Sequence, residues 1–259
     1  MTFSVYSAKT KSRNIRLLVL ACICAIVISS RVFAGSLTLE RPDVDVNWNR
    51  IPAPATAAAP SQAAPVEIKF GPNRLFGTVE IRSKIKNLPQ WERILRAHAN
   101  KTNVIESALK SSGRARELQT WNTIRAAAPK PPTLETLRTV NAFFNQWPYR
   151  TDMEVYGVPD YWATPAEFIS KSGDCEDYSI TKMYALLDLG HPADQMRLVI
   201  LKDTIRNLDH AVLAVYLNDN VYILDNMTNQ VNTHERYRYY MPQLSMDSVF
   251  RWAHLPAKK

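Results

Sequence analysis

The sequence predicts an α+β fold in which a helical first half packs on an antiparallel sheet formed by the second half. Between about residues 90 and 190, apolar side chains recur at spacings of three and four residues, which is typical of helices with one buried face. Beyond Pro192 the pattern changes to short runs in which apolar and polar residues alternate, which is typical of strands. Helical runs followed by strand runs favour an α+β architecture.

Two segments precede the predicted domain. Residues 1–34 combine a basic start, an apolar run from Leu17 to Ile28 and a Val-Phe-Ala ending, which are typical of a secretory signal cut before Gly35. We therefore expect an exported protein; an uncleaved segment would instead act as a membrane anchor. Residues 35–69 form an N-terminal extension with a Pro/Ala-rich linker over 51–66. The folded domain is expected over residues 70–255.

The distribution of charge argues against a nucleic-acid partner. The formal net charge is +8, but five basic residues and no acid fall within residues 1–34, so the remainder carries +3. This remainder contains no basic run with interleaved aromatic residues, which is the pattern that indicates nucleic-acid binding. We expect no nucleic-acid partner.

Helices are predicted in the first half from apolar spacing combined with start and stop signals. They span Gln90–Asn100, Asn103–Lys110, Arg114–Ala128 and a run capped by Thr133 that continues to Trp147. Residues 148–165, which are rich in tyrosine and tryptophan, are predicted to be an irregular loop that lines a groove or packs on the core.

The most informative helix begins near residue 174. Asp174 is a suitable N-cap, and Gly190 and Pro192 end the helical pattern, so Cys175 is expected at the helix N-terminus. The amide dipoles there favour a thiolate, which is the nucleophilic form of cysteine. The alternative is a small apolar residue buried under the first turn.

Cysteine usage supports a chemical role for Cys175. The other two cysteines, Cys22 and Cys24, lie within the signal and leave with it. A solitary cysteine in an oxidising compartment is either paired between chains or kept free for reaction.

Three strands are predicted after this helix, at Met196–Lys202, Ala211–Leu217 and Val221–Leu224. Asn218-Asp219-Asn220 supplies turn residues between the last two, so the strands form an antiparallel meander. A final pair, Arg236–Met241 and Val249–Trp252, extends the sheet.

His210 and Asp225 mark the ends of two neighbouring strands. With a two- or four-residue loop, Val212 faces Asp225 and His210 becomes its diagonal neighbour on the same face, about 7–8 Å away between Cα atoms. A three-residue loop without a bulge would place the two on opposite faces. A thiol, an imidazole and a carboxylate together supply a nucleophile, a general base and an orienting group. The alternative is a strand-end histidine and an acid that faces the turn.

Four motifs carry a resemblance to a known family: Trp162-Ala-Thr-Pro165, Gly173-Asp-Cys-Glu-Asp-Tyr178, Asp209-His-Ala-Val-Leu213 and Ile223-Leu-Asp-Asn226. The sequence resembles the bacterial transglutaminase-like cysteine proteinases, and more closely their LapG-type periplasmic members. The resemblance implies a papain- or transglutaminase-like core in which Cys175 is the nucleophile, His210 the general base and acid, and Asp225 the orienting residue.

The resemblance also implies a biological role. It suggests a calcium-dependent periplasmic cysteine endopeptidase that cleaves the N-terminal region of a large cell-surface adhesin and thereby promotes biofilm dispersal. The implied inhibitor is an inner-membrane receptor for cyclic-di-GMP.

The acidic residues Asp174, Glu176 and Asp177 surround the cysteine. Like charges this close raise a thiol pKa, whereas a bound divalent cation reverses the local sign. Carboxylates are ligands that calcium prefers. The alternative is that Asp174 and Asp177 form a capping pair while Glu176 complements the helix dipole. The resemblance favours calcium.

Two other functions stay open. A transglutaminase would use the same three residues but let an amine attack the acyl-enzyme. A non-enzymatic calcium-dependent adaptor would keep the fold without a reactive thiol.

Overall fold

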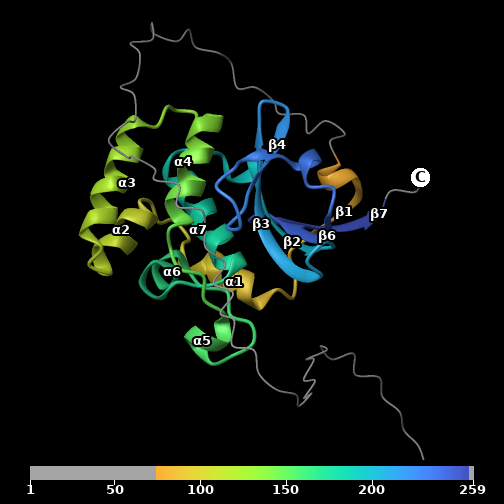
Figure 1. Ribbon diagram of the computed structural model, residues 1–259, viewed down its shortest axis with the longest axis horizontal. Helices are drawn as coiled ribbons and strands as arrows, with labels where there is room; N and C mark the ends of the chain where they lie inside the picture. The colour runs from red at the N-terminus through yellow and green to blue at the C-terminus, as the bar shows by residue number, and fades with distance from the viewer. Residues whose placement is uncertain (1–73, 257–259) are drawn as a thin grey trace, which may run out of the picture. The chain divides into compact units, whose positions relative to one another are not determined.

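The computed structural model describes residues 74–256, so the predicted signal (1–34) and extension (35–69) lie outside the described residues. This part of the chain consists of helices and one seven-stranded antiparallel sheet (Figure 1). The predicted α+β class is confirmed. Each helix within residues 74–256 is too short or too polar to cross a membrane.

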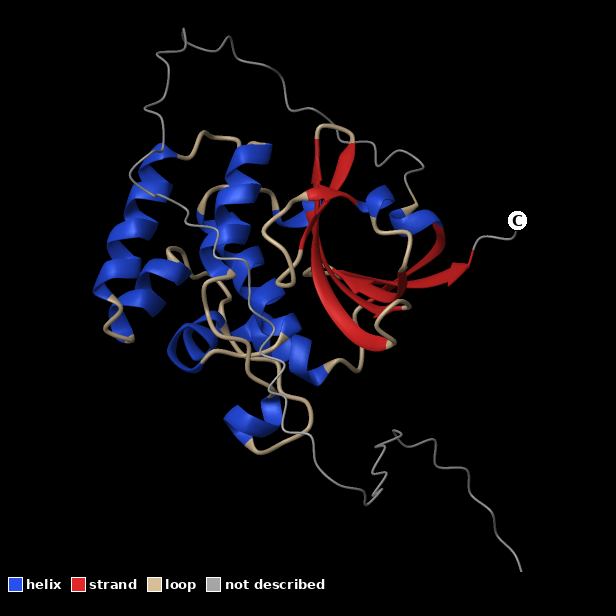
Figure 2. Cartoon of the chain, in the orientation of Figure 1, coloured by secondary structure: helices blue, strands red, loops and turns tan. Residues whose placement is uncertain are grey.

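The helices follow one another in the first part of the domain, on one side of the sheet (Figure 2). They are α1 (Pro89–Ala97), α2 (Val104–Ser111), α3 (Ala115–Ala127), α4 (Leu134–Phe144), α5 (Asp152–Tyr156), α6 (Pro165–Lys171) and α7 (Cys175–Asp188). The first four and α7 occupy the predicted helical runs. Pro89 lies in the first turn of α1 and Thr133 is the N-cap of α4, as expected.

The expectation of an irregular segment over 148–165 is wrong in part. Helix α5 lies inside it and α6 begins at its last residue. Both helices start with a capping box, formed by Thr151 with Glu154 and by Thr164 with Glu167. The Thr-x-x-Glu spacing is itself a helix-start signal, and Pro165 at the first position strengthens the second one.

The sheet has the strand order β1-β7-β6-β2-β3-β4-β5. Its strands are β1 (Thr78–Lys84), β2 (Met196–Asp203), β3 (Leu208–Leu217), β4 (Asn220–Leu224), β5 (Asn232–Thr233), β6 (Tyr240–Met246) and β7 (Phe250–Pro256). Short 3-10 turns lie at η2 (Leu75–Gly77), η3 (Ala193–Gln195) and η4 (His234–Arg236). The meander of β2, β3 and β4 is confirmed.

Two strand expectations need correction. The predicted strand at 236–241 starts too early, because η4 ends at Arg236 and β6 begins only at Tyr240. Strand β6 then joins the β2 side of the meander rather than following β4. Strand β1 escapes prediction because Val79 and Ile81 are its only bulky apolar residues and its partner, β7, lies at the far end of the domain.

The β3–β4 hairpin fixes the relation between His210 and Asp225. Leu217 pairs with Asn220 and Leu213 with Leu224, so the loop has two residues. Those residues, Asn218 and Asp219, both have positive φ (49° and 59°), as the tight hairpin turn that matches strand twist requires. The two-residue alternative is confirmed and the three-residue alternative is wrong.

Strands β2 and β3, in the middle of the sheet, are covered on both faces. Helix α7 packs on β2 and β3 from one side. Leu75, Tyr237 and Tyr240 cover the opposite face. This second layer explains why Ala211–Val215 is buried without a break, rather than alternating as a one-sided sheet would.

Candidate active site

Cys175 is the first residue of α7, as predicted, and it is partly exposed. Asp174 is the N-cap, and its backbone N–H donates to Asp177 Oδ2 at 3.3 Å. The capping pair of Asp174 and Asp177 is thus present. One turn later, Ser179 Oγ donates to the Ala211 carbonyl on β3 at 3.3 Å, which holds the start of α7 beside the strand that carries His210.

Gly173 allows the chain to pass close to Asp177. A Cβ added at Gly173 would lie 1.9 Å from Asp177 Oδ2 and 2.8 Å from Asp177 Cβ. Asp177 has nowhere to move without losing the hydrogen bond that its Oδ1 accepts from the Ala163 N–H at 2.6 Å. Position 173, two residues before Cys175, is therefore glycine for steric reasons.

We expect Gly173→Ala to lower the free energy of unfolding by about 2 kcal/mol, the typical cost of forcing extra atoms into a packed site. Substrate cleavage should fall with it, because Asp177 sets the start of α7. Urea denaturation and a cleavage assay measure the two effects. Gly113→Ala is the control for cleavage: its added Cβ meets nothing within 4 Å but strains the backbone at φ +69°, so it should lower stability without lowering cleavage. Wild-type stability and cleavage in Gly173→Ala would contradict this account.

His210 and Asp225 are brought together as the register predicted. His210 Nε2 lies 3.0 Å from Asp225 Oδ1, and both side chains are buried. Tyr240 donates its hydroxyl to Asp225 Oδ2 at 2.6 Å, and the Met227 N–H donates to Oδ1 at 2.9 Å. Burial alone would raise the pKa of Asp225, but the hydrogen bonds from His210, Tyr240 and Met227 outweigh it and hold that pKa below its usual value.

His210 and Asp225 are therefore in direct contact rather than separate. Tyr240 is a site residue that sequence reasoning missed. It comes from β6, on the other side of β2 from β3 and β4 in the strand order, and from the face opposite α7. No local pattern around Tyr240 signals that contact.

The Cys175 thiol points to carboxylates in this structure. It donates to Glu176 Oε2 at 3.3 Å, and no hydrogen bond joins it to His210 within residues 74–256. Burial first, and then the charges of Glu176 and Asp174, raise the pKa of this thiol well above its usual value, while the backbone of Ala211 acts in the opposite direction. The acids around Cys175 therefore disfavour the thiolate form that the helix dipole favours.

Those acids belong to a larger cluster than the sequence indicated. Asp152, Asp174 and Asp177 each place a carboxylate oxygen within 4.8 Å of the others, and Asp152, Asp160 and Glu176 do the same. Burial raises the pKa of all three predicted acids, that of Asp177 to about 8. No salt bridge neutralises these five carboxylates within the described part of the chain. Asp152 and Asp160 were missed because they lie in the segment read as an aromatic loop.

The oxygens of this acidic cluster differ in what they already contact. Asp152 Oδ1 and Asp174 Oδ1 are buried and have no hydrogen-bond partner among residues 74–256. Asp177, by contrast, accepts backbone hydrogen bonds on both oxygens. A set of buried carboxylate oxygens with open positions fits a hard divalent cation, with Asp174, Glu176 and Asp152 better placed than Asp177.

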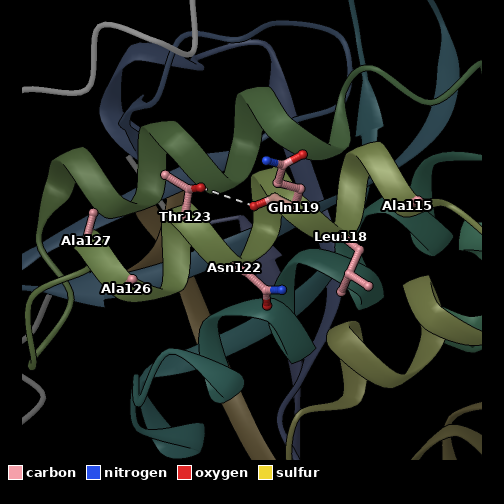
Figure 3. Close-up of a pocket in the computed structure, with 7 residues that line it drawn as sticks. All are labelled: Ala115, Leu118, Gln119, Asn122, Thr123, Ala126 and Ala127. Carbon is pink, nitrogen blue, oxygen red and sulfur yellow. Dashed lines mark hydrogen bonds between the residues drawn. The ribbon is translucent and has the colours of Figure 1, made fainter.

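A groove on α3 lies apart from these residues. Its lining consists of side chains on one helix, drawn in Figure 3: Ala115, Leu118, Gln119, Asn122, Thr123, Ala126 and Ala127. None of them is nucleophilic, basic or acidic. We find no support there for the predicted chemistry.

A thiol at a helix N-terminus, an imidazole and a carboxylate are the groups that cysteine-dependent acyl-transfer enzymes use. The family model of the bacterial transglutaminase-like cysteine proteinases (BTLCP) matches residues 114–259, more than half of the chain. The chain belongs to this family and is a cysteine peptidase. Comparison with curated proteins gives no match.

Among solved structures, part of the chain is similar to LapG from Legionella pneumophila. The match to that structure has 29% sequence identity and a TM-score of 0.48, and covers 56% of this chain and 84% of the other. An EGTA-treated form gives 29% identity, a TM-score of 0.48 and coverages of 56% and 82%. A calcium-bound form gives 30% identity, a TM-score of 0.48 and coverages of 55% and 83%. The family assignment rests on the family model.

Proposed function

We propose that Cys175, His210 and Asp225 are the catalytic triad of an endopeptidase. The observation that carries the proposal is the buried hydrogen bond between Asp225 and His210, whose strand β3 packs against the helix that begins at Cys175. In a chain that belongs to a cysteine peptidase family, this is the group of residues that can activate and orient a thiol.

Each residue has a definite task in this scheme. The Cys175 sulfur attacks the peptide carbonyl while His210 takes the thiol proton on Nδ1, because Nε2 faces Asp225. His210 then gives that proton to the leaving amine, and water releases the acyl group from the sulfur. Asp225 fixes the imidazole tautomer throughout. The first N–H groups of α7 have no acceptor inside the helix and are suited to stabilise the carbonyl oxygen as it becomes negative.

We further propose that the acidic cluster holds calcium. Asp174 and Glu176 are the main ligands, Asp152 and Asp160 complete the set, and Asp177 contributes chiefly by fixing the loop at Ala163. Bound calcium would supply positive charge beside the thiol and so offset the carboxylates that favour its protonated form. The unpartnered oxygens of Asp152 and Asp174 support this assignment.

We propose a large cell-surface adhesin as the substrate, cut in its N-terminal region, and an inner-membrane cyclic-di-GMP receptor as the inhibitor. The LapG-type motifs around Cys175 and His210 support both. The test is incubation of the purified protein with the N-terminal region of a giant adhesin encoded nearby, followed by mass spectrometry of the products. An intact adhesin after prolonged incubation with calcium would contradict the proposal.

One alternative gives a different product. With a glutamine donor and a labelled amine, a transglutaminase would incorporate the label, whereas a peptidase would release a fragment. Membership of a cysteine peptidase family argues against the non-enzymatic adaptor. Reaction of Cys175 with iodoacetamide faster than a model thiol, in the presence of calcium, would exclude the adaptor directly.

We expect the mature protein in the periplasm, with Gly35 as its first residue. The reason is the basic start, short apolar run and Val-Phe-Ala ending of residues 1–34. N-terminal sequencing of the protein recovered from a periplasmic fraction checks this. Recovery from the cytoplasm with Met1 intact would contradict it, and recovery from the inner membrane with Met1 intact would instead indicate an uncleaved anchor.

A further inference from the structure

A lysine side chain on α7, the helix that begins at Cys175, is completely buried. Lys182 lies two turns beyond Cys175 on α7 and has 0% exposed surface. Its Nζ donates to Asn141 Oδ1 of α4 at 2.8 Å and lies 5.6 Å from the centre of the Tyr178 ring. Removing an ammonium group from water is costly unless a compensating charge or hydrogen bonds lie nearby. The mechanism described above makes no use of this group.

The partner of Lys182 is tied to the turn that carries Asp225. Asn141 Nδ2 donates to the Thr228 carbonyl at 2.8 Å. One turn along α4, Asn145 Nδ2 donates to the carbonyls of Asp225 and Thr228, both at 3.0 Å. Helix α4 therefore holds residues 225–228 through two asparagines, and the ammonium of Lys182 is bonded to one of them.

Asp225 is contacted by groups from several elements. His210 faces it from β3 and Tyr240 from β6, while the Met227 N–H belongs to its own turn. Burial lowers the pKa of Lys182 to about 7, and the charge of Asp225 acts in the opposite direction. The link from Lys182 to the Asp225 turn is therefore the hydrogen bond to Asn141 rather than a permanent charge.

We propose that Lys182 is a positioning residue for Asp225: its hydrogen bond to Asn141 fixes the amide that, with Asn145, holds the 225–228 turn and so keeps Asp225 oriented toward His210. The inference rests on the proposed function, since Lys182 acts only through Asp225. It assigns no direct contact between Lys182 and substrate.

Two substitutions test the hydrogen bond. Lys182→Met removes the donor to Asn141 while keeping a side chain of similar length, and Lys182→Gln keeps a donor. We expect both variants to fold, with Lys182→Met losing about tenfold in kcat at unchanged KM, which corresponds to about 1.4 kcal/mol of lost transition-state stabilisation, and Lys182→Gln losing less. Lys110→Met, at an exposed lysine of α2, is the control.

A spectroscopic readout separates positioning from simple structural support. In ¹⁵N-labelled protein, the His210 ring, assigned by comparison with His210→Gln, should carry its proton on Nε2 in the wild type. The fraction in that tautomer should fall in Lys182→Met and fall less in Lys182→Gln. Because this measurement needs no substrate, it tests Lys182 even if the adhesin proves to be the wrong substrate.

The outcomes distinguish failure of the Lys182 inference from failure of the proposed function. Wild-type kcat and tautomer in Lys182→Met would overturn the inference while leaving the triad intact. Failure of both variants to fold would make Lys182 a structural residue and would also overturn it. Absence of cleavage by the wild type would contradict the proposed function instead.

Discussion

Cys175→Ala, His210→Ala and Asp225→Ala are each expected to reduce kcat for adhesin cleavage by roughly 10⁴-fold or more, to near background, because such residues act as a unit and their losses do not add. The reason is structural as well as chemical. Removing Asp225 leaves the buried His210 ring without the carboxylate, 3.0 Å away, that fixes its orientation. Asp225→Asn should retain more activity than Asp225→Ala, since an amide oxygen can still accept from Nε2.

The measurement is kcat on the purified adhesin segment, with circular dichroism to confirm folding. Thr123→Ala on the exposed α3 groove is the control, and should cleave as the wild type does. Cleavage at the wild-type rate by Cys175→Ala would end the proposal that this thiol is the nucleophile.

The second large effect concerns calcium. EGTA should stop cleavage, and added calcium should restore it better than magnesium, because a cluster with several carboxylates suits the larger, more flexibly coordinated ion. Asp174→Ala and Glu176→Ala should lose both calcium binding and cleavage without unfolding. In the wild type, saturating calcium should also raise Tm, since a ligand that binds only the folded state stabilises it.

Calorimetry measures binding and a thermal melt measures Tm. Asp194→Asn is a suitable control, since Asp194 is an exposed acid on η3 outside the acidic cluster. Asp177→Ala should behave differently from the other cluster variants and lower stability, because Asp177 holds the Ala163 and Asp174 N–H groups. Full activity in excess chelator, with no heat of calcium binding, would mean that these acids only cap the helix.

Local signals explain why the candidate triad could be predicted from the sequence. The N-cap at Asp174 placed Cys175 at a helix start without any knowledge of the tertiary structure. Asn218-Asp219-Asn220 predicted a hairpin, but its loop length stayed open from the sequence, and the two-residue loop of the structure is what puts His210 beside Asp225. Both inferences depend on residues close together in the chain.

Residues that reach the site through tertiary packing could not be predicted in this way. Tyr240 approaches Asp225 only because η4 delays the start of β6 and the chain then crosses to the far side of β2. Asp152 joins the acidic cluster through α5, a helix of five residues. Lys182 reads as a polar residue on a helix and is buried only because α4 and the sheet enclose α7.

The pairing of β1 with β7 has a consequence for the timing of folding. Thr78, the first residue of the sheet, lies opposite Pro256, the last, so β1 has no partner until β7 is in place. Contacts between residues this far apart in the chain form late, since the entropy of closing the long intervening loop must first be offset. This edge of the sheet is therefore expected to be among the last parts of the domain to close.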